Sequence, residues 1–276
     1  MRGLLRRSPK SVLFAAALAA VWTTASAPAQ ADYPVDYNFF SGIPAELTNP
    51  GGSLPGANDW SCRPTAVHPD PVVLLHGSGG GGQTNWGVYA PLLANEGYCV
   101  YSLTYGALPA PWPLDSIGAQ RPIPESAAQV GAFIDRVRAA TGADRVDIVG
   151  HSRGNAVGNY YINNLGGAGK VDTFVALAPR WLRGTEWLPE SGGGYNPTVT
   201  YTNILTRYDE IIVPYTVGQA PGPNATTIVV QDGCESDLSE HLGIAGSPRA
   251  AAFALNALDP ANPRPVPCEL IPPFTG

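Results

Sequence analysis

The chain has 276 residues, of which 44 % are hydrophobic and 14 % are charged, and its formal net charge is −6. This composition supplies enough apolar material for a full core, suits one domain rather than several, and excludes a largely disordered chain. No block of basic residues follows the first ten residues, so nucleic-acid binding is not expected.

The first 31 residues have the three-part pattern of a secretory signal peptide. The basic residues are Arg2, Arg6, Arg7 and Lys10. The apolar run that follows is Ser11–Trp22, and the small-residue cleavage site is Ala29-Gln30-Ala31. The apolar run is shorter than the roughly 20 residues needed to cross a bilayer. We therefore expect removal of residues 1–31 on export, and a secreted, extracellular protein without stable membrane insertion.

Export makes the four cysteines candidates for disulfides, because oxidising compartments preserve such bonds. Four cysteines permit three connectivities. The pairs Cys62–Cys99 and Cys234–Cys268 are favoured, since each would tie a Pro-rich terminal segment to the nearest core element. A zinc site is the alternative use of cysteine, but the sequence has no CxxC pair and no His-x3-5-His spacing, so no metal site is expected.

Residues 32–71 are rich in Pro, Gly and Asn and predict an extended N-terminal arm. Residues 72–276 predict one folded domain with a disulfide-tied C-terminal tail, because short apolar runs alternate there with helical segments. The predicted strands are Val72–His76, Val100–Thr104, Val146–Val149, Phe174–Ala178, Tyr201–Leu205 and Thr227–Val230. The predicted helices are Glu125–Thr141, Gly154–Leu165 and a last one from Ser247 to Asp259. This order predicts the α/β class, a mostly parallel central sheet with helices on both faces and its active site at the carboxyl ends of the strands.

The strongest chemical signal is Gly150-His151-Ser152-Arg153-Gly154, which directly follows a predicted strand and opens a predicted helix. This is the context of a nucleophile elbow, where a serine sits on a turn too tight for large neighbours. The pentapeptide alone is a weak signal, but the strand–turn–helix context makes it specific. We interpret Ser152 as a nucleophile; the alternative is a plain turn with a capping serine.

A nucleophilic serine needs a base, and elimination points to one histidine. In hydrolases with such an elbow the order along the chain is serine, acid, histidine. His68 and His76 precede Ser152, and His151 adjoins it with a side chain expected to project away from the catalytic face. His241 remains as the base, with a surface or packed histidine as the alternative.

The acid should lie between nucleophile and base, just after a strand. Asp209 follows the predicted strand Tyr201–Leu205, from where a carboxylate can hold the imidazole. Glu210 is the rival and is expected to face another way. Asp232 and Asp237 are weaker candidates because they follow the next strand.

An oxyanion hole requires backbone amides aimed at the developing negative charge. The amide of Arg153, after the nucleophile, is one candidate. The glycine-rich loop after the first strand supplies the other, for which we favour the amide of Ser78. No Lys-Ser/Thr follows this loop, which excludes a phosphate-binding P-loop.

These motifs, in order from about Trp60 to Pro260, resemble the secreted class 2 lipases of actinobacteria. The matching strings are Val72-Val73-Leu74-Leu75-His76-Gly77, Asn85-Trp86-Gly87, Gly97-Tyr98-Cys99-Val100, Gly150-His151-Ser152, Thr206-Arg207-Tyr208-Asp209-Glu210 and Ser239-Glu240-His241-Leu242.

The resemblance implies an α/β-hydrolase fold, no cofactor, and hydrolysis of acylglycerols or simpler esters. By this resemblance Ser152 corresponds to the nucleophile, Asp209 to the acid and His241 to the base. Two residues depart from the family pattern, which has Gln-Gly after the serine and then another small residue. Arg153 and Asn155 stand there instead, and the guanidinium of Arg153 is a candidate influence on substrate choice.

Two loops are candidates for lining the substrate site: residues 107–124 with Trp112, and residues 179–196 with Trp181 and Trp187. The second loop is a candidate lid beside a glycine hinge; alternatively its aromatic residues only pack it down. The expected partner is an ester or lipid substrate and the expected state a monomer. Lipase, esterase and cutinase-like polyester hydrolase stay open, as do a serine peptidase, an acyltransferase and a non-catalytic surface-binding domain.

Overall fold

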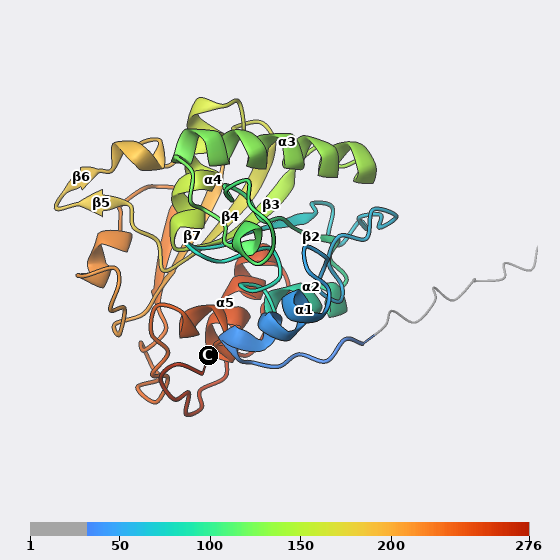
Figure 1. Cartoon of the computed structure of the whole chain (residues 1–276). Coiled ribbons are helices and arrows are strands. Elements are labelled where there is room, and N and C mark those ends of the chain that lie inside the picture. The colour runs from blue at the N-terminus through green and yellow to red at the C-terminus, as the bar shows by residue number, and fades with distance from the viewer. Residues whose placement is uncertain (1–31, 276) are drawn as a thin grey trace, which may run out of the picture. The chain divides into compact units, whose positions relative to one another are not determined.

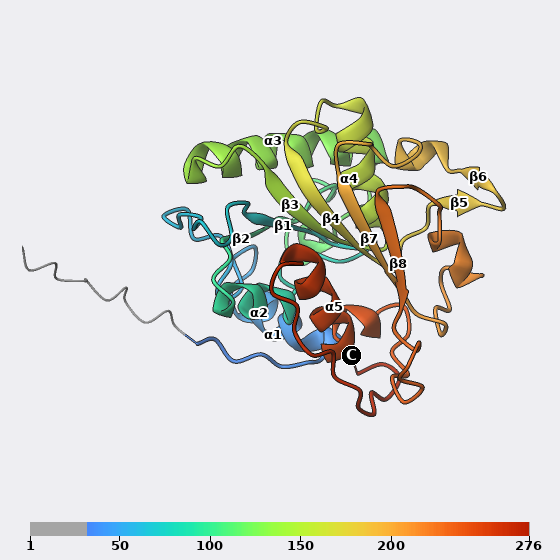
Figure 2. The ribbon, with the colours of Figure 1, turned by 180° about the vertical axis from the view of Figure 1, so that it is seen from behind.

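The computed structural model describes residues 32–275, so the predicted signal peptide of residues 1–31 lies outside the described residues. A six-stranded sheet with the order β2-β1-β3-β4-β7-β8 forms the centre of the fold, and all its strand pairs are parallel (Figures 1 and 2). The strands are β1 (Val72–Leu75), β2 (Val100–Ser102), β3 (Val146–His151), β4 (Val171–Leu177), β7 (Thr200–Leu205) and β8 (Ala225–Val229). The predicted mostly parallel sheet is confirmed.

Helices cover both faces of this sheet, as predicted. On one face lie α3 (Ile123–Thr141) and α4 (Arg153–Asn164), and on the other lie α2 (Tyr89–Asn95) and α5 (Pro248–Leu258) (Figure 1). Successive residues of β1 enter the two core clusters alternately, Val73 and Leu75 on the α3 side, Val72 and Leu74 on the α2 side. Burial of apolar side chains on both faces explains why the strands are apolar throughout.

Helix ends follow local sequence signals. Pro124 occupies the first turn of α3, where a missing N–H costs nothing, and Gly142 ends this helix in the left-handed conformation. Ser247 caps α5, because its side chain accepts a hydrogen bond from the amide of Ala250.

The N-terminal arm is extended only in part. It contains a 3-10 helix η1 (Phe39–Gly42) and a short helix α1 (Ile43–Thr48). Asn38 caps η1, and the carboxylate of Glu46 holds this segment to the domain by accepting a hydrogen bond from Gln83 Nε2 at 2.7 Å. The amide of Phe39 donates to the carbonyl of Thr275. The prediction of an extended arm missed these helices because they are too short to show a helical period.

Disulfides join the four cysteines in the two favoured pairs, Cys62–Cys99 and Cys234–Cys268. The first ties the arm to the residue before β2, and the second ties the C-terminal tail to the loop that follows β8. Within residues 32–275, no helix is both long and apolar enough to cross a membrane.

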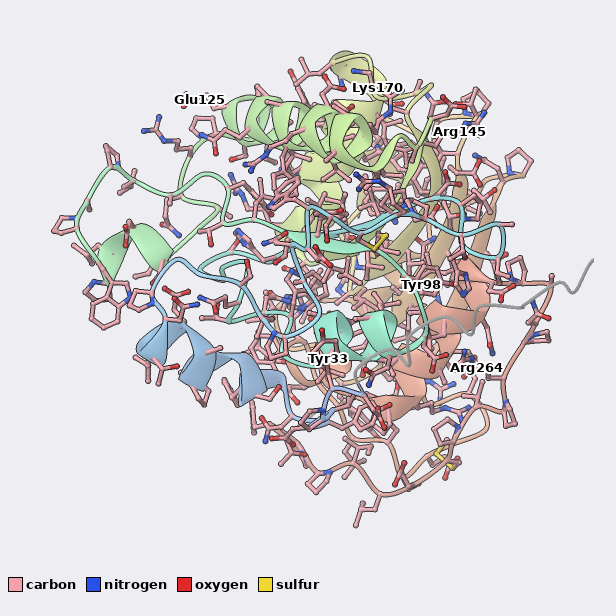
Figure 3. The ribbon with its side chains drawn as sticks, turned by 90° about the vertical axis from the view of Figure 1, so that its right-hand side faces the viewer. Tyr33, Tyr98, Glu125, Arg145, Lys170 and Arg264 are labelled. Carbon is pink, nitrogen blue, oxygen red and sulfur yellow. A yellow bond between two sulfur atoms is a disulfide. The ribbon has the colours of Figure 1, made fainter. Side chains whose placement is uncertain are left out.

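Three carboxylates lie together at the amino ends of the central strands. Asp70, Asp147 and Asp172 have oxygen atoms within 4.8 Å of one another. In Figure 3, Arg145, which pairs with Asp172, lies toward one end of the sheet, whereas α1 lies toward the other. Burial, together with the nearby charge of Asp70, raises the pKa of Asp147 well above its usual value.

We predict that Asp147→Asn stabilises the protein at neutral pH. A raised folded-state pKa means that the folded protein loses stability as pH rises through that pKa. Asparagine has no charge to bury and can still accept the hydrogen bond from the amide of Thr173. The difference in melting temperature between variant and wild type should grow from pH 5 to pH 8. Glu186→Gln, an exposed control, should show no such trend, and an equal loss of stability at both pH values would contradict the prediction.

Candidate active site

The turn between β3 and α4 holds Ser152 in a strained conformation, with φ 52° and ψ −120°. Few residues other than glycine adopt a positive φ, so such strain marks a functional turn. A Cβ on Gly154 would lie 2.1 Å from the carbonyl oxygen of Leu75, and one on Gly150 would lie 2.4 Å from Asn155 Oδ1. Both glycines are therefore required by the packing of the turn against β1 and α4.

Three of the predicted site residues meet at this turn. His241 Nε2 lies 2.8 Å from Ser152 Oγ, and His241 Nδ1 lies 2.9 Å from Asp209 Oδ2. The side chains of His241 and Asp209 are only 4 % and 3 % exposed. The second oxygen of Asp209 accepts hydrogen bonds from the amides of Ile211 and Ile212, which fix the carboxylate. This geometry permits proton transfer from the serine to a histidine that a carboxylate orients.

The rival acids make other contacts. Glu210 Oε2 accepts a hydrogen bond from the backbone amide of His241 at 3.1 Å, rather than from its imidazole. Asp232 pairs with Arg207. Asp237 is buried and accepts hydrogen bonds from amide and hydroxyl groups around it. Strand-end geometry therefore distinguishes Asp209 from its neighbours.

The loop after β1 faces the same turn. Its backbone is held by hydrogen bonds from Gly79 N to the carbonyl of Gly118 and from Gly80 N to the carbonyl of Gly77. The amide of Ser78 donates to no group within the described part of the chain, and Ser78 lines the pocket beside Ser152. Arg153 is the first residue of α4, where a peptide N–H has no acceptor within the helix. Both candidate oxyanion donors are thus free to bind a ligand oxygen.

Two further histidines lie beside the site, and both are fully buried. His76 stacks on Tyr105 and contacts the carbonyl of Gly77 through Nδ1. His151 does not project away as expected: its Nε2 lies 2.8 Å from the carbonyl oxygen of His241. Burial lowers the pKa of His76 to about 4 and that of His151 to about 3, so both rings are neutral at neutral pH.

A pocket of about 560 Å³ opens over Ser152. This volume is that of a small-molecule site. Apolar side chains from three separate segments form most of its wall: Phe39, Phe40, Ile43 and Leu47 from the arm, Trp112, Pro113 and Ile117 from the loop after β2, and Ile211 and Leu242 from the loops after β7 and β8. Glu46 is the single carboxylate among these lining residues. The sequence predicted that Trp112 lines the pocket. It missed the contribution of the arm, because a Pro- and Gly-rich segment has no pattern that indicates pocket-lining residues.

Trp181 and Trp187 do not line this pocket, which corrects the prediction. Trp181 is fully buried, and its Nε1 donates to Asn203 Oδ1 at 2.8 Å. Trp187 packs against Trp181 and Tyr195. The chain after β4 forms an antiparallel hairpin of β5 (Leu182–Arg183) and β6 (Glu186–Trp187) that these aromatic rings attach to the core. The aromatic residues of this loop therefore pack it against the core, as the packing alternative expects.

The guanidinium of Arg153 is also turned from the pocket. Its Nη2 donates to the carbonyl of Arg121 at 3.1 Å, and Arg153 is not a lining residue. The structure thus gives this side chain no direct part in substrate choice.

Comparison with known proteins agrees with this description. Residues 69–182 match the model of the family described as lipase (class 2). Among solved structures, XC6422 from Xanthomonas campestris, described as an α/β serine hydrolase without lid, has a TM-score of 0.50 and 20 % identity, over 71 % of this chain and 83 % of that chain. BpoC from Mycobacterium tuberculosis H37Rv, provisionally assigned as a non-heme bromoperoxidase, has a TM-score of 0.50 and 16 % identity, over 70 % of this chain and 92 % of that chain.

At these identities the structural likeness bears on the fold alone, whereas the family match also covers the strand, turn and helix that hold Ser152. Residues 69–182 of this chain therefore match the class 2 lipase family model, and they lie within an α/β-hydrolase fold.

Proposed function

We propose that this protein is a serine ester hydrolase that cleaves acylglycerols or related carboxylic esters. The observation that carries the proposal is the pair of contacts from His241, 2.8 Å to Ser152 Oγ and 2.9 Å to Asp209 Oδ2. The class 2 lipase match over residues 69–182 supports the same reaction class. A non-catalytic binding domain would have no need of a strained serine beside a buried imidazole and carboxylate.

In the proposed reaction, Ser152 Oγ bonds to the ester carbonyl carbon while His241 Nε2 takes the serine proton. The amides of Ser78 and Arg153 bind the oxygen that becomes negative, and Asp209 stabilises the imidazolium. The carbon–oxygen bond to the alcohol then breaks, and His241 gives its proton to the departing alcohol. Water, deprotonated by His241, next bonds to the acyl carbon. The bond from that carbon to Ser152 Oγ then breaks, His241 returns the proton to Oγ, and the acid is released.

The pocket wall favours an uncharged acyl chain. Most of its lining is apolar, and its one carboxylate, on Glu46, already accepts hydrogen bonds from Gln83 and from the amide of Gly51. An anionic substrate would find no lysine or arginine among the lining residues. We therefore propose medium or long acyl esters as substrates.

Exposed apolar side chains around the pocket mouth favour an insoluble substrate over a dissolved one. Phe40, Leu47 and Ile211 line the pocket and are 41 %, 61 % and 63 % exposed. Leu114 follows the lining residue Pro113 in the chain, Val213 lies two residues after Ile211, and they are 57 % and 73 % exposed. Emulsified triacylglycerol and solid polyester both present an apolar surface that these side chains can contact. A cutinase-like activity on polyesters is therefore the second candidate function.

Secretion is part of the proposal. It is supported by the pattern of residues 1–31 and by two disulfides, which persist in oxidising compartments.

The first test is hydrolysis of p-nitrophenyl esters with short to long acyl chains by wild type and Ser152→Ala. We expect the variant to lose at least about 1,000-fold in kcat, because no other group on this turn can form the acyl-enzyme. Asp209→Asn should lose about 10,000-fold, through disturbance of the imidazole tautomer, and Glu210→Gln far less. Equal turnover by wild type and Ser152→Ala would show that the nucleophile is misassigned.

Activity should depend on pH between pH 5 and 8 through the base that takes the serine proton. We expect kcat/KM for a soluble ester to fall on the acidic side, since a protonated base cannot accept the serine proton. His76 and His151 stay neutral across this range because burial lowers their pKa values to about 4 and about 3. Samples returned to pH 8 should regain full activity, which separates titration from unfolding. A flat profile would exclude His241 as the base.

The exposed apolar mouth makes a separate prediction for insoluble substrates. Leu114→Ser combined with Val213→Ser should lower the rate on emulsified triacylglycerol by about threefold to tenfold, because apolar area is lost from the contact with the lipid surface. Neither residue lines the pocket, so kcat/KM for a soluble short-chain ester should stay within about twofold. Val67→Ser, at a side chain 66 % exposed in the arm, is the matched control. An enzyme inert on the emulsion but active on soluble esters would be an esterase and not a lipase.

A further inference from the structure

The proposed base does not lie on a regular element of the fold. His241 is in the loop between β8 and α5, just before the 3-10 turn η5 (Gly243–Ala245). Its ring contacts Ser152 and Asp209, but ring contacts alone do not fix a side chain whose backbone can move. A catalytic group must be held within about 0.5 Å of its productive position. The position of the His241 backbone therefore requires its own support.

The backbone carbonyl of His241 is held by His151. His151 Nε2 lies 2.8 Å from that oxygen, and its Nδ1 lies 3.1 Å from Asn85 Oδ1. A neutral imidazole has one N–H, so it can donate to only one of these two oxygens. The shorter contact assigns the proton to Nε2, which then donates to the His241 carbonyl. His151 is only 1 % exposed, and its ring packs against those of His241 and Phe39, which limits the access of water to this bond.

The backbone amide of His241 is held by Glu210. Glu210 Oε2 accepts a hydrogen bond from this N–H at 3.1 Å. A carboxylate acceptor strengthens such a bond relative to a neutral one. All four polar groups of His241 thus have partners: the carbonyl has His151, the amide has Glu210, Nδ1 has Asp209 and Nε2 has Ser152.

These partners come as two pairs of adjacent residues. His151 directly precedes Ser152, and Glu210 directly follows Asp209. In each pair one residue contacts the imidazole and its neighbour contacts the peptide groups of the same histidine. A shift of the His241 loop would therefore break backbone and ring contacts together.

We propose that His151 and Glu210 are positioning residues for the base, and that they hold the His241 backbone in place through its carbonyl and its amide. This inference rests on the proposed function, since it assigns these residues to the same catalytic histidine. Neither side chain takes part in proton transfer. Their effect is on the fraction of molecules in which Nε2 is aligned with Ser152, and it should therefore appear in kcat and not in substrate binding.

The test compares variants that keep or remove each hydrogen bond. His151→Gln keeps an N–H donor on a side chain of similar length, whereas His151→Leu removes it. Glu210→Gln keeps an acceptor, whereas Glu210→Ala removes it. For p-nitrophenyl acetate we expect His151→Leu to lose about tenfold or more in kcat with KM changed less than about threefold. His151→Gln should recover most of this loss. Glu210→Ala should show a smaller loss, which Glu210→Gln restores.

Melting temperature is measured for each variant, because His151 is buried and its leucine variant can fail to fold. Glu210 is exposed, so its pair of variants tests the inference even in that case. Equal kcat losses in the two His151 variants at equal melting temperatures would overturn the role of His151. Unchanged kcat in Glu210→Ala would overturn the role of Glu210.

The rate of Ser152 labelling by a fluorophosphonate is measured on the same variants. This reaction uses the serine and its base but needs no ester turnover. If the wild-type protein is labelled and hydrolyses no ester, the proposed substrate class fails, while the positioning of His241 is still tested by the labelling rates. If the wild-type protein turns over esters and all variants are labelled at the wild-type rate, the positioning inference alone fails.

Discussion

The close contact between the turn at Ser152 and strand β1 is the constraint on which the rest of the site depends. Gly154 lies so near the carbonyl of Leu75 that no side chain fits between them. This contact places the residues after β1 directly beside the residues after β3. It therefore brings the glycine-rich loop of Ser78 to the serine, and it forces Ser152 into a conformation that few residues adopt. The cost of that conformation, of the order of 1–3 kcal/mol, is offset by burial of the two strands and α4.

Parallel strands explain the remainder of the arrangement. The residues after β7 and β8 emerge at the same edge of the sheet as those after β1 and β3, although they lie far apart in the sequence. Asp209 and His241 therefore meet Ser152 although the three residues follow three different strands. The three buried histidines differ in what surrounds them. Desolvation keeps His76 and His151 neutral, whereas His241 contacts the carboxylate of Asp209.

Sequence reasoning worked where a residue type and its neighbours determine local geometry. The six main strands, α3, α4 and α5 were predicted because their apolar runs and terminal residues are local signals. The pentapeptide at Ser152 predicted the turn because only glycines fit on both sides. Elimination among four histidines and the order along the chain singled out His241, and the structure brings it within hydrogen-bond distance of Ser152 and Asp209.

The failures concern residues whose role depends on distant partners, and one helix that is too short to show a period. Trp181 and Trp187 have the composition of a substrate loop, but Asn203 and Tyr195, which attach them to the core, cannot be identified as partners from spacing. His151 was expected to face away from the site. This was wrong because its ring contacts the carbonyl of a residue 90 positions later, which spacing along the chain does not reveal. The helix α1 is six residues long, too short to produce a period, so its place in the pocket wall had no signal in the sequence.

The residues that line the pocket and the proposed catalytic residues come from different parts of the chain, and this has a consequence for how the protein can diverge. Ile43 and Leu47 come from α1, which Glu46 attaches to Gln83 and Gly51, whereas Asp209 and His241 come from the loops after β7 and β8. Substitutions on this helix can therefore alter which ligands fit the pocket without changing the residues around Ser152. Homologues that take different ligands should vary first in the arm, before the turn at Ser152 changes.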